Sequence, residues 1–189
     1  MAFCENLVFV DAETDGLYGP FISVAMKVIK IQSGEEIARF YYGLERDRLD
    51  IREEWVKENV MPYLGTYTEC QSQEELLQKV WEFWEQYRGN SLAIADVVFP
   101  VEARLFSACV QLDEKNRRYH APFPFLDLST MLFQIGMDPH VERDTLVEGT
   151  PDGKKHNAMY DVDVSIMIWK KYMRKNDGFA VCEGSSQIM

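Results

Sequence analysis

The residues that most directly suggest chemistry lie in a short acidic stretch near the N-terminus. Asp11 and Glu13 follow the apolar run 7–9 and precede a turn at Gly16. A short run of aromatic and β-branched residues is typical of a buried strand, in which side chains two apart point to the same side. Two such carboxylates repel each other unless a cation lies between them, and divalent cations such as Mg²⁺ prefer oxygen ligands. At this stretch alone, a strand end followed by a solvated turn residue is an equal alternative.

Two later apolar segments also end in an aspartate. The run 91–95 leads into Asp96, and the run 122–126 leads into Asp127. Asp96 therefore ends a predicted strand, and it can meet the first strand if the two pair in parallel across a helical connection. Asp127 has a simpler interpretation, because aspartate is a favoured N-cap and residues 128–135 are expected to form a helix.

The last predicted helix adds a fourth acid and a histidine. Asn157 is a favoured N-cap type, so the helix runs from there to about residue 173 and leaves His156 just outside it. Asp161 shares one helical face with residues three and four positions away, and that face is largely packed. A carboxylate beside a packed face needs a partner. An imidazole titrates near neutral pH and can accept a proton from water, so this context favours a functional His156.

The remaining strands predict an α/β fold with a mixed central sheet. Strands are expected over 21–31 and 37–44, and their short connections require an antiparallel meander with the first strand. The strand 91–96 follows long helical connections and pairs in parallel with the first strand. Asp96 then lies beside Asp11 at one sheet edge, and the last helix adds Asp161.

The predicted helices mostly serve the core. They are expected over 52–60, over 73–87 after a capping box at Ser72, and from Pro100 to about 113. The aromatic residues of helix 73–87 recur at helical spacing, which we assign to core packing rather than to base stacking. The polar, turn-rich segment 136–155 is interpreted as a long surface segment or a mobile lid.

Composition and charge limit the classes of function. The chain has 189 residues, of which 47% are hydrophobic, and this favours one packed domain. Its net charge of −11 argues against a broad basic surface for long nucleic acid, although divalent cations would reverse the local field in a pocket. We see no membrane span and no signal peptide. The cysteines predict reduced thiols and a cytoplasmic protein, since Cys4, Cys70, Cys109 and Cys182 form no Cys-x-x-Cys pair.

Three of these stretches together resemble the motifs of the DEDD exonuclease superfamily, histidine subclass. They are the stretch from Asp11 to Gly16, the aspartate Asp96, and the stretch from His156 to Asp161. The resemblance spans residues 7 to about 173. The superfamily has a ribonuclease H-like fold and includes polymerase proofreading domains, oligoribonuclease and ribonuclease T.

The resemblance implies a metal-dependent 3′–5′ exonuclease with His156 as the general base. The ligands that it implies for two Mg²⁺ or Mn²⁺ ions are Asp11, Glu13, Asp96 and Asp161. Phosphodiester hydrolysis independently favours two cations about 4 Å apart, because one oxygen attacks while another leaves. At the second motif, Asp127 and Glu102 remain alternatives to Asp96. The exonuclease domain is expected over 1–175, with residues 176–189 as a C-terminal tail.

The implied substrate is a single-stranded 3′ end of RNA or DNA, which the acidic charge predicts to be short. Thr14, Gly16, Leu17 and Tyr18 are expected to bind it, with Leu17, Tyr18 or Phe21 stacking on the terminal base. Lys154 and Lys155 flank His156 and could meet a phosphate, whereas His120 and His140 are interpreted as surface residues. Several relatives are dimers, which leaves a homodimer open by analogy.

Two other functions remain open from the sequence. A ribonuclease H-like domain that has lost catalysis and docks nucleic acid or protein would also fit the net charge and the unusual residues after Asp96. An endonuclease on the same fold is a weaker third possibility. Chelation of metal separates the binding module from the enzymes, and the pattern of cleavage products separates the two enzymes.

Overall fold

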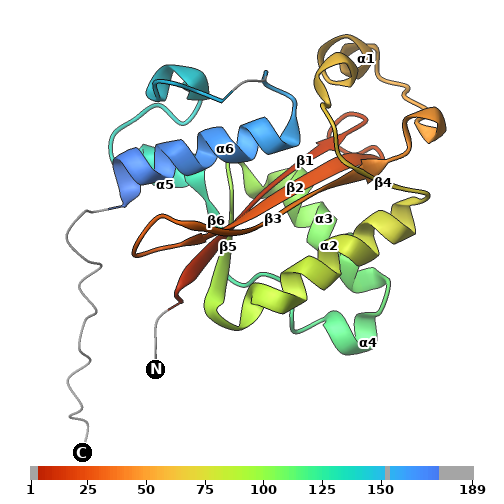
Figure 1. Ribbon diagram of the computed structural model, residues 1–189, viewed down its shortest axis with the longest axis horizontal. Coiled ribbons are helices and arrows are strands. Elements are labelled where there is room, and N and C mark those ends of the chain that lie inside the picture. The colour runs from red at the N-terminus through yellow and green to blue at the C-terminus, as the bar shows by residue number, and fades with distance from the viewer. Residues whose placement is uncertain (1–3, 152–153, 175–189) are drawn as a thin grey trace, which may run out of the picture.

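A mixed β-sheet with helices on both faces forms the fold (Figure 1). The structure is a computed structural model, which describes residues 4–151 and 154–174. Its strand order is β4-β3-β2-β1-β5-β6. The antiparallel meander consists of β1 (Asn6–Thr14), β2 (Phe21–Lys30) and β3 (Glu36–Leu44). The parallel strands are β4 (Thr68–Cys70), β5 (Ser91–Ala95) and β6 (Phe125–Asp127). The predicted α/β class and the parallel pairing of β1 with β5 are confirmed.

Helices cover the sheet on both sides. They are α1 (Glu54–Asn59), α2 (Gln73–Tyr87), α3 (Ala103–Gln111), α4 (Glu114–Arg117), α5 (Leu128–Gln134) and α6 (Ala158–Ile168). A π-helical turn (Val98–Glu102) precedes α3 and another (Trp169–Met173) extends α6, while four short 3₁₀ turns lie at 46–48, 61–63, 88–90 and 143–146. In Figure 1, α5 and α6 lie on one face, and α2, α3 and α4 lie on the other.

Helix starts follow the capping residues that the sequence indicates. The side chain of Ser72 accepts a hydrogen bond from Glu75 N (3.1 Å) at the start of α2. Asp127 accepts one from Thr130 N (2.7 Å) at α5, and Asn157 accepts from two backbone N–H groups at α6. Each cap satisfies a donor that the first helical turn leaves without an intrahelical partner.

The alternation of β1 decides where its acids point. Val8 and Val10 belong to the core beneath α2 and α3, whereas Leu7 and Phe9 belong to the core beneath α5 and α6. Because side chains in a strand alternate between faces, the odd-numbered Asp11 continues the α6 side, as does Glu13 after it. Two-sided burial also explains why residues 7–10 are all apolar.

Helix α2 packs its aromatic face into the core, as predicted. Trp81 and Trp84 are buried in the cluster formed with β1 and β2, and Phe83 and Tyr87 pack against it. Phe21 differs from one of the sequence expectations, because it is buried beneath the Arg104 guanidinium and is not free to stack on a base. The short β4 and α4 were not predicted.

The segment after α5 is fastened to the fold along residues 143–146. Tyr160 Oη donates to Asp144 Oδ1 (3.1 Å), and Tyr172 Oη donates to Leu146 O (3.0 Å). Arg143 reaches the end of β5 from the same turn. This part of segment 136–155, which we interpreted as a surface segment or a mobile lid, is therefore packed against its neighbours.

Some sequence expectations concern the parts of the chain that are not described. The predicted tail 176–189 and Cys182 lie outside the described residues. Cys4, Cys70 and Cys109 are free thiols, in agreement with the absence of a Cys-x-x-Cys pair. Within residues 4–151 and 154–174, no helix has the length and apolar character needed to span a membrane.

Candidate active site

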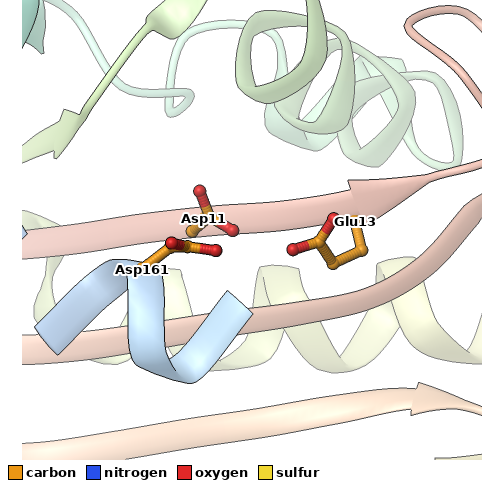
Figure 2. Close-up of side chains that lie close together, drawn as sticks. All are labelled: Asp11, Glu13 and Asp161. Atoms are coloured by element: carbon orange, nitrogen blue, oxygen red, sulfur yellow. The ribbon is translucent and has the colours of Figure 1, made fainter. Parts of the chain in front are cut away.

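Three carboxylates meet where β1 passes under α6. Asp11 and Glu13 come from the strand, and Asp161 comes from the first turn of the helix. One ligand oxygen from each lies within 4.8 Å of the other two, and Figure 2 shows the three side chains turned toward a common point. We call these residues the carboxylate cluster. Side chains repeat every two residues in a strand and about every 3.6 residues in a helix. These repeats predicted that the three acids converge, and in the structure they place the acids on facing sides of β1 and α6.

Electrostatics in the carboxylate cluster are unfavourable without a cation. Burial raises the pKa of Asp11 well above its ordinary value, and the charges of Asp161 and Glu13 raise it further. Burial and Asp161 raise the pKa of Glu13 to about 8, and burial raises the pKa of Asp161 to about 7. Buried carboxylates resist ionisation next to each other, and a divalent cation removes that cost. The all-oxygen donor set suits Mg²⁺ or Mn²⁺ better than zinc.

Glu102 is a fourth buried acid beside the cluster. It ends the π-helical turn before α3 and is only 6% exposed. Burial raises the pKa of Glu102 to about 8. Its charge raises the pKa of Glu13, and its effect on the pKa of Asp11 is larger than that of Asp96. The sequence retained Glu102 only as an alternative second-motif acid.

Asp96 lies at the end of β5, as expected, but it already has a cationic partner. Arg143 Nε donates to Asp96 Oδ1 at 2.7 Å. Burial raises the pKa of Asp96, and Arg143 opposes that rise. Asp127 also has partners, because its carboxylate oxygens accept hydrogen bonds from Thr130 N and Val98 N. Among the three alternatives, Asp96 alone has a cationic partner in the described contacts, and Asp127 is held by backbone N–H groups.

His156 lies beside Asp161 and is held by its backbone. Its N–H donates to Asp161 Oδ2 (2.8 Å), and its φ of 66° falls in the left-handed region. The imidazole is half-buried and meets the edge of the Trp55 ring, with ring centroids 4.9 Å apart. Burial and the nearby Lys155 lower the pKa of His156, which favours the neutral imidazole, the form that can accept a proton.

A cleft of about 630 Å³ contains the carboxylate cluster, Asp96, Glu102 and His156. Of the residues expected to bind substrate, Thr14, Gly16 and Leu17 line it. The Thr14 hydroxyl donates to Gly16 O (2.6 Å) and so closes the turn after β1. Tyr18 is 69% exposed but is not among the residues that line the cleft.

The basic residues near His156 are engaged within the protein. Lys155 forms an ion pair with Glu142, and the Lys154 ammonium lies 4.8 Å from the centroid of the Tyr63 ring. His120 is partly exposed beside Glu85, whereas His140, which we interpreted as a surface residue, is exposed and lines the cleft.

Sequence reasoning missed three residues that shape the cleft. Trp55 and Phe99 line it with exposed rings, and Arg143 fastens its wall. Arg143 also donates to Ser129 Oγ and to two carbonyl oxygens of its own segment. The sequence signal available for Trp55 was an aromatic residue among the charged residues of the expected helix 52–60. Nothing in segment 136–155 distinguishes Arg143 from the other charged residues there.

The pairing of Arg143 with Asp96 has a measurable consequence. We expect Arg143→Ala to lower the free energy of unfolding by roughly 1–3 kcal/mol, because it leaves a mostly buried carboxylate without its cation. Adding Asp96→Asn to that variant should cost much less than Asp96→Asn costs in the wild type. Urea unfolding of the four proteins at pH 7 without metal gives the coupling free energy. Additive costs would contradict the pairing.

No protein-family model and no curated protein sequence matches this chain. Solved structures do match, and they establish that the chain has a ribonuclease H-like α/β fold, which it shares with solved nuclease structures. At the level of the fold, the resemblance drawn from the three motifs is therefore confirmed.

Three solved structures illustrate the likeness. Cell-death related nuclease 4 (CRN-4) aligns with 89% of this chain at a TM-score of 0.58 and 14% identity. The nuclease domain of 3′hExo, a DEDDh family member bound to rAMP, aligns with 90% at 0.51 and 12%. Exonuclease I from Methylocaldum szegediense aligns with 92% at 0.54 and 15%. The chain spans 63%, 94% and 42% of these structures, respectively.

Proposed function

We propose that this protein is a metal-dependent 3′–5′ exonuclease that acts on single-stranded RNA or DNA ends. The observation that carries the proposal is the convergence of Asp11, Glu13 and Asp161, within 4.8 Å, in a fold shared with solved exonucleases. The polarity comes from the family resemblance. The exonuclease domain is proposed to comprise residues 1–175, and a cytoplasmic location and a homodimer stay predictions.

The carboxylate cluster would hold divalent cations, with a fourth acid from Asp96 or Glu102. Two Mg²⁺ or Mn²⁺ ions would supply a nucleophilic water at neutral pH and offset charge on the attacking and leaving oxygens. The raised pKa values of Asp11 and Glu13 support this role, since these groups gain most from a bound cation.

His156 is proposed as the general base. Its lowered pKa favours the neutral imidazole, whose unprotonated ring nitrogen can take the proton of the attacking water. Its backbone bond to Asp161 keeps the residue next to the carboxylate cluster, and the Trp55 ring limits how far the imidazole can turn. Thr14 and Gly16 shape the turn that borders the substrate, and Leu17 and Tyr18 offer exposed side chains near its end.

A labelled-oligonucleotide assay tests the proposal. With 5′-labelled single-stranded RNA or DNA and Mn²⁺ or Mg²⁺, we expect a ladder of products that shorten from the 3′ end, and EDTA should stop the reaction. Asp11→Ala and His156→Ala should each lower the rate by about 10²-fold or more. Matched controls are Asp50→Ala, which changes an exposed acid, and His120→Ala, which changes a histidine away from the cleft.

One observation favours the alternative of an inactive binding module. Arg143 forms an ion pair with Asp96, the acid that the sequence assigns to the second motif. If Asp96 must bind metal, this pairing works against catalysis. Absence of any metal-dependent cleavage by the pure protein, combined with binding of the same oligonucleotides, would support the module and contradict the exonuclease. Internal fragments in place of a ladder would indicate an endonuclease.

A further inference from the structure

A lysine lies buried in the middle of the central sheet. Lys27 is 5% exposed and sits on β2 between the fully buried Met26 and Val28. Its neighbours on the same face of the strand, Ala25 and Ile29, belong to the apolar core beneath α6. Lysine is almost never buried without a partner, and apolar residues commonly replace a buried ion pair at no cost in stability. Stability alone therefore does not explain a lysine at this position.

The ammonium group of Lys27 joins three elements of the fold. Its Nζ lies 2.5 Å from Asp163 Oδ1 on α6 and 3.1 Å from Glu36 Oε2 at the start of β3. The side chains of these two acids are 26% and 27% exposed, so the ion pairs are largely shielded from solvent. Among the hydrogen bonds and ion pairs of residues 4–151 and 154–174, the bond to Asp163 is the one that links a side chain of α6 to a strand.

The rest of α6 offers little that defines its rotation about its own axis. Val162, Ile166 and Ile168 are all buried in the core between the helix and the sheet. Apolar burial has no direction, and similar contacts form after a small rotation of the helix. A polar contact inside an apolar interface sets the register, as polar core residues do in coiled coils. The pair of Lys27 with Asp163 is such a contact.

The rotation of α6 matters because the helix carries Asp161. Asp161 and Asp163 are two positions apart, which is about 200° around the helix axis, so they project from opposite flanks of α6. Val162, which lies between them, is buried beneath the helix. A rotation that takes Asp163 away from Lys27 therefore also moves Asp161 relative to the two acids of β1.

We propose that Lys27 is a positioning residue, whose ion pair with Asp163 sets the rotation of α6 and thereby holds Asp161 at the carboxylate cluster. The inference rests on the proposed nuclease function for its consequence, because a displaced Asp161 matters to a protein that binds cations there. Lys27 is not among the residues that line the cleft, so it acts through the helix. Residues that orient metal ligands in this way affect metal affinity without touching the ion.

An apolar replacement of the pair separates positioning from stability. In Lys27→Met/Asp163→Leu the interface stays filled and loses its directed contact. A cavity of about 210 Å³, lined in part by Asp163, Ile29 and Ile166, gives the leucine room. Because apolar residues commonly replace a buried ion pair without loss, Tm of this double variant in EDTA should equal or exceed that of the wild type.

Amide hydrogen exchange reports the position of Asp161 without any metal. The N–H of His156 donates to Asp161 Oδ2 at 2.8 Å, and this bond depends on the rotation of α6. In the double variant the His156 amide should exchange about tenfold faster than in the wild type, while the amides of β1 keep their rates. Lys79→Met/Glu82→Leu, at an exposed ion pair on α2, is the matched control and should leave the rate unchanged. Equal exchange of the His156 amide in all three proteins would overturn the proposal.

Binding of Mn²⁺ gives the second readout, measured from the electron paramagnetic resonance signal of the free ion. The double variant should bind Mn²⁺ about 10–100-fold more weakly than the wild type. Asp163→Asn nearly keeps the shape of the side chain but turns a charge-assisted hydrogen bond into a weaker neutral one. It should shift both readouts in the same direction by about threefold, and it decides the question if the double variant does not fold. Wild-type Mn²⁺ affinity in a folded double variant would contradict the positioning role.

The two readouts distinguish failure of this proposal from failure of the nuclease function. Suppose that the wild type binds no Mn²⁺ and cleaves nothing, but that the His156 amide still exchanges faster in the double variant. Lys27 then positions Asp161, and the nuclease function is rejected. If the wild type cleaves oligonucleotides with Mn²⁺, and the double variant matches it in exchange and in Mn²⁺ affinity, the nuclease function stands and the role of Lys27 is rejected.

Discussion

Replacing Asp11 with asparagine is expected to remove nuclease activity and, at the same time, to make the metal-free protein more stable at pH 8. The change keeps the shape of the side chain but takes one negative charge out of the carboxylate cluster. Losing that ligand weakens cation binding, and we expect kcat/KM to fall about 10³-fold or more, which corresponds to about 4 kcal/mol. Sites built for function commonly lower stability in this way.

The gain in stability follows from the direction of the pKa shifts. In the folded protein the pKa of Glu13 is raised from 4.5 to about 8, and that of Asp11 is also raised. A carboxyl with a raised folded pKa contributes its full stability only below its unfolded pKa, and the contribution is lost as the pH rises to the folded value. The metal-free wild type should therefore lose stability between about pH 4.5 and pH 8. The Asp11→Asn variant carries one repelling charge fewer and should lose less.

Thermal unfolding with EDTA and with Mn²⁺ checks both halves of this prediction. At pH 8 in EDTA, Asp11→Asn should raise Tm by roughly 4–8 °C, as expected for a gain of about 2 kcal/mol in a domain of this size. Excess Mn²⁺ should raise the Tm of the wild type and have little effect on the variant. Asp50→Asn, at an exposed position, should change neither value. A variant that is less stable in EDTA, or a wild type that ignores Mn²⁺, would refute the cation site.

The carboxylate cluster could be predicted because regular elements build it. Asp11 and Glu13 share a face by the period of a strand, and Asp161 follows the Asn157 cap by one helical turn. Strand order was predictable for a similar reason, since short turns force antiparallel pairing and long helical connections permit parallel pairing. These features depend on local pattern, which the sequence displays directly.

The rest of the site depends on contacts that no local pattern encodes. Arg143 meets Asp96 across 47 positions, and it does so through an irregular segment with many other charges. Glu102 is oriented by a π-helical turn, where the regular helical period fails. Trp55 reaches His156 because Asp15 holds the start of α1, and a carboxylate beside a turn indicates no distant partner by itself.

Glu102→Gln is expected to damage catalysis far more than Asp96→Asn. Glu102 is buried, and its charge raises the pKa of both Asp11 and Glu13, whereas Arg143 offsets part of the charge of Asp96. We therefore expect Glu102 to be the fourth acid that holds cations. Its amide variant should lower kcat about 10²-fold or more and weaken Mn²⁺ binding, since the change removes a ligand without altering the size of the side chain.

Asp96→Asn should produce the opposite pattern. It leaves the Arg143 guanidinium without its carboxylate, so the free energy of unfolding should fall, while kcat at saturating Mn²⁺ should change less than about tenfold. Measuring kcat, the Mn²⁺ dependence of the rate and urea unfolding for both variants separates the two roles. If Asp96→Asn abolishes the Mn²⁺ response and Glu102→Gln does not, then Asp96 is the ligand. In that case Arg143 must leave Asp96 whenever cations bind, and its segment would have to move during each turnover.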